Sequence, residues 1–161
     1  MRMKKLLLLL LMITTVASCS QTKVGILRSY AFSRLEFPGM VTVNERSRGA
    51  DTSYVVYLEA NKSDSIICNK AIINGSCYNV ITSKIENAVL VGILSSNNDT
   101  ASISAKPENN LWQLNLEKTS SCLERESSIT TNVILLHLMN GKKIIQLSIK
   151  PIIQLQPRHY M

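Results

Sequence analysis

The sequence predicts an all-β fold, a single antiparallel β-sandwich of seven to nine strands. Short runs rich in β-branched and aliphatic residues recur between turn signals, and the apolar spacing of an amphipathic helix is almost absent. Two Asn-Gly pairs, Asn74-Gly75 and Asn140-Gly141, each lie between two such runs, as in a two-residue β-hairpin. An immunoglobulin-like arrangement fits this pattern, and a small β-barrel is the alternative.

Nine runs are predicted to be strands. They cover residues 23–28, 40–45, 53–59, 65–73, 76–84, 88–94, 111–118, 130–139 and 142–150. Two polar loops separate some of them, one at 44–52 and one at 95–110, which is rich in Ser and Asn. The only helix expected is a single turn over 121–126. Pro151 lacks an N–H, so it ends ladder pairing or places the following tail on a sheet edge, and residues 157–161 are expected to be a loose terminus.

Each Asn-Gly pair predicts a strand register, because both central positions of such a turn need a positive φ. The first hairpin is expected to pair Ile73 with Ser76, Ile72 with Cys77, and Cys68 with Ile81. The second is expected to pair Met139 with Lys142, Leu136 with Ile145, and Ile134 with Leu147. In the second hairpin one face is entirely apolar and is predicted to be core: Ile134, Leu136, Leu138, Ile145, Leu147 and Ile149.

The N-terminus has the composition of a secretory signal. Arg2, Lys4 and Lys5 precede an apolar run that starts at Leu6 and ends in small residues before Cys19. A transmembrane helix needs about 20 apolar residues, and this run is shorter and contains two threonines. The chain is therefore expected to be exported, with residues 1–18 as the signal peptide.

The stretch Val16-Ala17-Ser18-Cys19 resembles the lipobox of bacterial lipoproteins. The resemblance implies that the Cys19 thiol receives a diacylglycerol, that cleavage follows Ser18, and that acyl chains such as palmitate hold the protein to a membrane. Residues 19–22 would then be a short lipidated tether and 23–161 the β-sandwich domain. Because Ser20 is not the aspartate that retains some lipoproteins in the inner membrane, the expected location is the periplasmic face of the outer membrane. Beyond its signal, the chain resembles small uncharacterised envelope lipoproteins and no specific family.

The charge of the mature chain is mild. The whole sequence carries a formal charge of +7, but without the three basic residues of the signal, fifteen Lys and Arg face eleven Asp and Glu, a balance of +4. This balance suits a protein near anionic headgroups, and an exported protein has little reason to meet nucleic acid.

Three cysteines remain in the exported domain, enough for one disulfide bond in an oxidising compartment. In the predicted hairpin Cys68 and Cys77 are separated by about 13 Å along the strands, and a disulfide needs Cα atoms within about 7 Å. Cys122 is therefore the expected partner of either Cys68 or Cys77. Three buried, reduced thiols are the alternative.

No motif in the sequence identifies a catalytic or metal site, and no cofactor is expected. His137 alternates with aliphatic strand residues, His159 is near the C-terminus, and there is no Gly-x-Ser-x-Gly nucleophile motif. Cys122 with two nearby glutamates and His137 lacks the close pair of ligands typical of zinc sites. Trp112 shares strand parity with Leu114 and Leu116, which favours core packing over a carbohydrate platform.

Lys23, Arg28, Arg34, Arg46 and Arg48 are interpreted as scattered solvated charges, with a basic patch near the membrane as the alternative. The function predicted is that of a lipid-anchored envelope protein without enzymatic activity, which binds or braces another envelope component. A glycan-binding or small-ligand module and a hydrolase with an unrecognised site are the alternatives.

Overall fold

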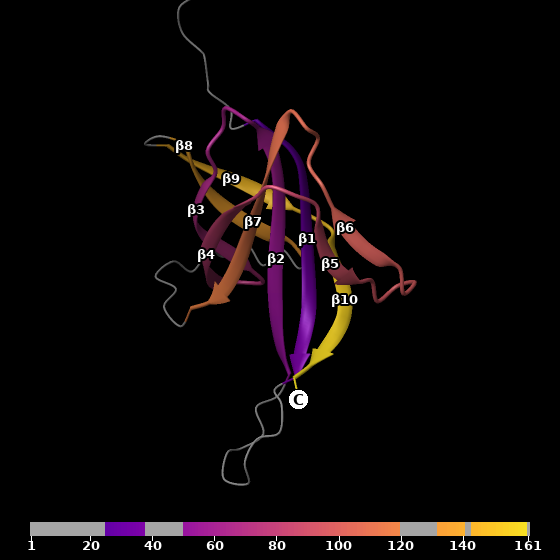
Figure 1. Ribbon diagram of the computed structural model, residues 1–161. Helices are drawn as coiled ribbons and strands as arrows, with labels where there is room; N and C mark the ends of the chain where they lie inside the picture. Colours follow the sequence, from indigo (N-terminus) through magenta and orange to yellow (C-terminus); the bar gives the residue numbers. More distant parts are fainter. Residues whose placement is uncertain (1–24, 38–49, 120–131, 141–142, 161) are drawn as a thin grey trace, which may run out of the picture.

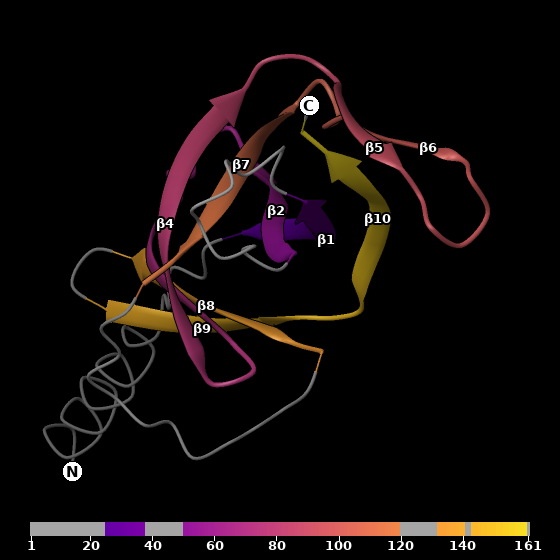
Figure 2. The ribbon, with the colours of Figure 1, turned by 90° about the horizontal axis from the view of Figure 1, so that it is seen from below.

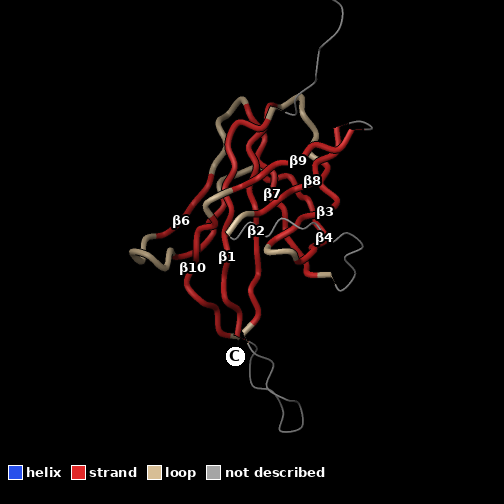
Figure 3. The backbone as a smooth tube through the Cα atoms, turned by 180° about the vertical axis from the view of Figure 1, so that it is seen from behind, coloured by secondary structure: helices blue, strands red, loops and turns tan. Residues whose placement is uncertain are grey.

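The computed structural model describes residues 25–37, 50–119, 132–140 and 143–160. Every regular element in these ranges is a strand, which confirms the predicted all-β class (Figure 3). No helix in these ranges is long and apolar enough to cross a membrane. The strands are β1 (Ile26–Phe37), β2 (Asp51–Asn61), β3 (Ile67–Ile73), β4 (Ser76–Ile85), β5 (Val89–Ile93), β6 (Thr100–Ile103), β7 (Asn109–Lys118), β8 (Ile134–Asn140), β9 (Lys143–Ile149) and β10 (Ile152–His159).

Eight of the strands form one sheet in the order β10-β1-β2-β7-β4-β3-β8-β9, and β5 pairs with β6 in a second, small sheet (Figure 1). Neighbouring strands are antiparallel except β1 and β10, which run parallel. The sheet is therefore mixed rather than purely antiparallel, and ten strands replace the seven to nine expected.

The large sheet is strongly curled (Figure 2). Strands β9 and β10 stand at opposite ends of its strand order, yet only Lys150 and Pro151 separate them along the chain. Three Cα steps reach at most about 11 Å, whereas eight strands laid flat would be about 33 Å wide. The sheet must curl to bring its ends together, and β9 indeed contacts β1.

The curl creates two hydrophobic cores, one on each face of the sheet. The inner core lies inside the curl, and its fully buried members include Val56, Leu58, Ala71, Leu114, Ile134 and Leu136. The outer core lies between the β10-β1-β2-β7 arm and the β5–β6 sheet, and it contains Phe32, Tyr57, Val91, Ile103, Leu111 and Leu155. This two-layer packing is the sandwich-like part of the fold.

Strand β2 is covered on both of its faces. Val56 and Leu58 point into the inner core, while Val55 and Tyr57 point into the outer core. The ring of Tyr57 meets that of Phe32 edge to face, with centroids 6.0 Å apart. A strand that is buried on both faces appears in the sequence as an unbroken apolar run, as β2 does.

The first predicted hairpin is confirmed near its turn. Asn74 and Gly75 both have positive φ, 49° and 76°, and the ladder pairs Ile73 with Ser76 and Ile72 with Cys77. The expected pairing of Cys68 with Ile81 is wrong. The β3–β4 ladder ends at Lys70 and Asn79, and Cys68 pairs instead with Leu138 of β8.

The register predicted for the second hairpin is wrong by two residues. Leu136 pairs with Leu147 rather than Ile145, and the ladder closes at Asn140 and Lys143. The two candidate turns differ by one residue: Gly141-Lys142 fits the Gly-first pattern of a two-residue loop as well as Asn140-Gly141 fits the Asn-Gly pattern. Because a shift of two preserves side-chain parity, the predicted apolar face is still the core face.

Three other strand predictions differ from the structure. Strand β1 continues to Phe37 instead of ending at residue 28, and β6 forms within the predicted loop 95–110. Pro151 does place the tail on a sheet edge, but that tail is strand β10, and His159 stacks on Phe37 at a centroid distance of 4.7 Å. The predicted strand 40–45, the helical turn 121–126 and most of loop 44–52 lie outside the described residues.

Replacing Gly75 by valine should destabilise the domain by about 1–2 kcal/mol, because a β-branched residue is strained at a φ of 76°. No atom lies within 4 Å of the position that a Cβ would take, so the loss would come from backbone strain alone. Chemical denaturation measures the effect. Asparagine tolerates positive φ, so Gly75→Asn should lose less than half as much, and equal stability of the Val variant would contradict the turn geometry.

Candidate functional site

The candidate site is a cleft of about 460 Å³ where the end of β4, the β2–β3 turn and the chain before β7 meet. We call it the lysine cleft because three lysines and one glutamate line it, a local excess of positive charge. Its charged residues are Lys62, Lys84, Lys106 and Glu86, and its other lining residues include Asn87, Pro107, Asn109 and Asn110.

One wall of the lysine cleft is a tight turn. The N–H of Asn109 donates to the carbonyl oxygen of Lys106 at 2.9 Å, which closes a four-residue β-turn with Pro107 in its second position. Proline favours that position because its ring already has the φ that the turn requires. The next residue, Asn110, is buried and donates through Nδ2 to the carbonyl oxygen of Lys62 at 3.2 Å, which joins the start of β7 to the β2–β3 turn.

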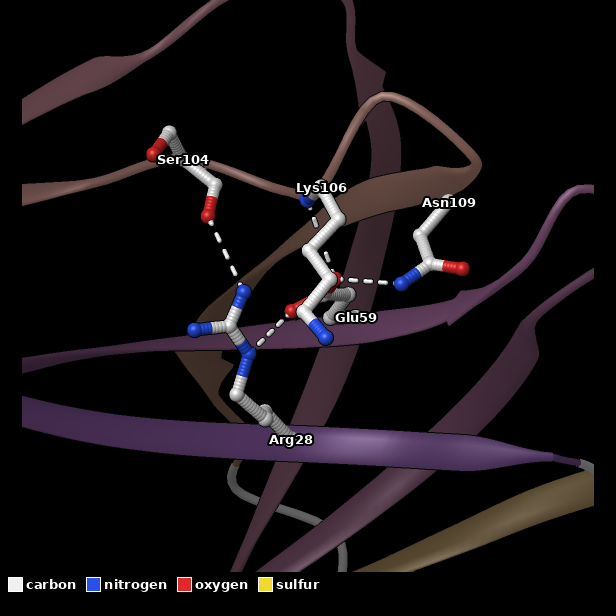
Figure 4. Close-up of polar contacts among 5 residues, drawn as sticks. All are labelled: Arg28, Glu59, Ser104, Lys106 and Asn109. Atoms are coloured by element: carbon white, nitrogen blue, oxygen red, sulfur yellow. Dashed lines mark hydrogen bonds and ion pairs between the residues drawn. The ribbon is translucent and has the colours of Figure 1, made fainter.

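Behind this turn lies a buried carboxylate. Glu59 of β2 is only 1% exposed, and its Oε1 accepts hydrogen bonds from the Lys106 N–H at 3.0 Å and from Asn109 Nδ2 at 2.6 Å (Figure 4). Its Oε2 is paired with the guanidinium of Arg28. One carboxylate therefore holds both ends of the turn and connects it to β1 and β2.

These contacts explain the electrostatics of the pair. The pKa of Glu59 is lowered to about 2, chiefly by the hydrogen bond from Arg28 and further by Asn109 and the Lys106 N–H, although desolvation opposes the shift. The pKa of Arg28 is raised, mainly by the same hydrogen bond to Glu59. Because Glu59 is ionised and both of its oxygens are engaged, its role is to fix the wall of the cleft rather than to transfer protons.

A cleft whose lining includes three lysines and one glutamate is suited to an anion. Lysine is a compact point charge that binds phosphate and carboxylate groups, and the neighbouring asparagines supply neutral hydrogen-bonding groups. A larger hollow of about 780 Å³ lies beside β1 and β2, but among its lining residues only Lys150 is charged. The lysine cleft is therefore the better candidate for a specific polar ligand.

Of the arginines interpreted as solvated charges, the structure describes two, Arg28 and Arg34. Both have partners within the domain. Arg28 pairs with Glu59, and Arg34 donates through Nη2 to the carbonyl oxygen of Val91 at 2.9 Å. They are therefore structural rather than parts of a surface patch. Lys23, Arg46 and Arg48 lie outside the described residues.

His137 and Trp112, interpreted from the sequence as sheet residues rather than as parts of a site, both lie in strands. His137 of β8 is partly covered, and its Nε2 lies 3.4 Å from Nε2 of Gln146 on β9. Trp112 packs against the inner core, as expected from its strand parity. In the described ranges no group of three His, Cys, Asp or Glu residues could hold a metal ion.

The cysteines are described only in part. Cys68 is a buried free thiol whose pKa is raised to about 11 by desolvation, and Cys77 is disulfide-bonded. Cys19 and Cys122 lie outside the described residues, so the bond from Cys122 stays a prediction.

Sequence reasoning missed the residues that build the cleft. A signal for Glu59 exists, since a single acid at the end of the apolar run 54–58 is typical of a buried, paired charge. The lysines are separated by about twenty residues each and stand in turns or at a strand end, so no local pattern connects them. Comparison with known protein families, curated proteins and solved structures gives no match to this chain.

Replacing Glu59 by glutamine should lower the free energy of unfolding by about 2 kcal/mol near neutral pH, because buried donors lose an ionised acceptor. The folded-state pKa lies below the ordinary value of 4.5, so this stabilisation is present above pH 4.5 and lost as the pH falls toward 2. Urea denaturation at several pH values measures the difference between parent and variant. A constant difference down to pH 2, or an equal loss in the exposed control Glu117→Gln, would contradict the role of Glu59.

Proposed function

We propose that this chain is a lipid-anchored envelope protein without enzymatic activity, attached through Cys19 to the periplasmic face of the outer membrane. It binds or braces another component of the envelope. The lipobox-like stretch 16–19 and the short apolar run before it support the anchor. The hydrogen bonds around Glu59 support a binding or accessory role, because both oxygens of this carboxylate are engaged by partners within the domain.

The observation that carries the proposal is the position of Gly25. Its N–H donates to Oδ2 of Asp64 at 3.0 Å, which fixes the start of β1 against the β2–β3 turn. Five residues lie between Cys19 and Gly25, so six Cα steps of at most about 3.5 Å each span roughly 20 Å. A lipid on Cys19 would therefore hold this end of the domain close to the bilayer.

Replacing Cys19 by serine should abolish incorporation of labelled palmitate and move the protein from the membrane fraction to the soluble fraction or leave it unprocessed. The physical reason is that the hydroxyl is a much poorer nucleophile than the thiol for the alkylation. Metabolic labelling followed by fractionation is the measurement. Ser20→Ala, one residue further on, is the matched control and should keep the label; labelling of the serine variant equal to the parent would refute the anchor.

The lysine cleft favours a second candidate function, that of a small-ligand module for an anionic compound. The charge excess of its lining and the rigid turn 106–109 support a phosphate-bearing or carboxylate-bearing ligand. The cleft lies beside the β2–β3 turn that receives Gly25, so a ligand at the membrane surface could reach it.

Pyrophosphate should raise the Tm of the parent protein in low salt, because a ligand that binds only the folded state stabilises it. The Lys84→Ala variant should lose at least half of that rise, since one of three ammonium groups is removed from the cleft. Differential scanning calorimetry gives both values. Lys118→Ala, an exposed lysine at the other end of β7, is the control, and an equal loss in both variants would show only unspecific charge attraction.

A further inference from the structure

An apolar row crosses the outer face of three neighbouring strands. Ile67 of β3 pairs with Met139 of β8, and Met139 pairs with Ile144 of β9, so the three side chains are cross-strand neighbours on one face. Ile67 is 53% exposed and Ile144 is 64% exposed, while Met139 is partly covered. We call these three residues the apolar row.

The apolar row differs from the rest of its sheet face. One step along the strands, the corresponding positions are Lys70, His137 and Gln146, which are polar. The two exposed isoleucines lie on β3 and β9, on either side of Met139 of β8, and β9 is the last strand in the order of the large sheet. Burial of these apolar side chains against an apolar surface would be favourable.

The row lies close to the point where the tether enters the domain. Asp64, which binds the N–H of Gly25, precedes Ile67 by three residues, so their Cα atoms are at most about 11 Å apart. The start of β1 and the free end of the β8–β9 hairpin both lie toward the same end of the molecule, the upper end in Figure 1. The tether of about six residues would bring this end within reach of the membrane surface.

We propose that the apolar row docks into the headgroup region of the same bilayer that holds the lipid on Cys19. This inference rests on the proposed lipid anchor. The tether length selects the bilayer over a distant partner, and the sequence next to the row is basic: Lys142 and Lys143 directly precede Ile144, and Lys70 occupies the adjacent position on β3. Lysines that adjoin the exposed isoleucines in the sequence or in the strand register suit an anionic lipid surface, where charge attraction and apolar burial act together.

The test uses tryptophan fluorescence in the full mature lipidated chain. The Ile144→Trp variant is reconstituted in vesicles of phosphatidylethanolamine and phosphatidylglycerol that contain brominated acyl chains, which quench nearby indole rings. Ile93→Trp on β5 is the matched control, since Ile93 is also an exposed isoleucine, 43% exposed, in a different sheet. The parent signal from Trp112 is subtracted, and thermal melts show that both variants are folded.

Brominated lipid should quench the added signal of Ile144→Trp by at least half and shift its emission to shorter wavelength, with little change in Ile93→Trp. Equal quenching of the two variants on vesicles that carry the protein would overturn the docking. The docking would also be overturned if the emission of Ile144→Trp shifted to shorter wavelength with increasing protein per vesicle but was not quenched by brominated lipid. That result would assign the row to contact with a second copy of the chain. Palmitate labelling is read on the same samples: unlabelled protein refutes the anchor and the docking with it, whereas labelled protein without quenching refutes the docking alone.

Discussion

The two-residue connection between β9 and β10 is the constraint on which the shape of the molecule depends. It joins strands at opposite ends of an eight-stranded order, so the sheet has to curl until its two ends approach each other. Closure puts one face of every strand toward a common interior, where the inner core collects residues such as Ala31, Val56 and Ile134 at zero exposure. The opposite face of β1, β2 and β10 also carries apolar side chains, and the β5–β6 sheet packs on them and buries them.

That second layer is attached by polar groups as well as by apolar packing. Arg34 donates to the carbonyl oxygen of Val91, and the adjacent Gly92, at a φ of 151°, leaves room for the guanidinium because a Cβ there would collide with it. At the other end, Glu59 holds the turn 106–109 against β2. A buried carboxylate is costly unless it is fully paired, so its three donors explain why an acid is tolerated at this position.

Local chemistry made parts of this fold predictable. Asn74 and Gly75 specify their turn because few other residues accept positive φ, and the alternation of Ile134, Leu136 and Leu138 identifies the core face whatever the register. Contacts between distant segments were not predictable. The pairing of β10 with β1 joins residues about 120 positions apart, and β6 pairs with β5 in a small sheet whose Ile103 packs into the outer core. The lysine cleft likewise joins three distant segments, the β2–β3 turn, the end of β4 and the chain between β6 and β7, which is why the sequence did not reveal it.

The lysine cleft, the Gly25–Asp64 contact and the apolar row lie at one end of the curled sheet because all three adjoin the β2–β3 turn. The β2–β3 turn contributes Lys62 to the cleft and Asp64 to the site that receives Gly25, and it leads directly into Ile67 of the apolar row. A domain held there by a tether of about six residues would present the same end to the bilayer at all times. In that orientation the lysine cleft and the apolar row would face the lipid headgroups. The opposite end of the domain, where β1 and β10 end, would face the aqueous compartment.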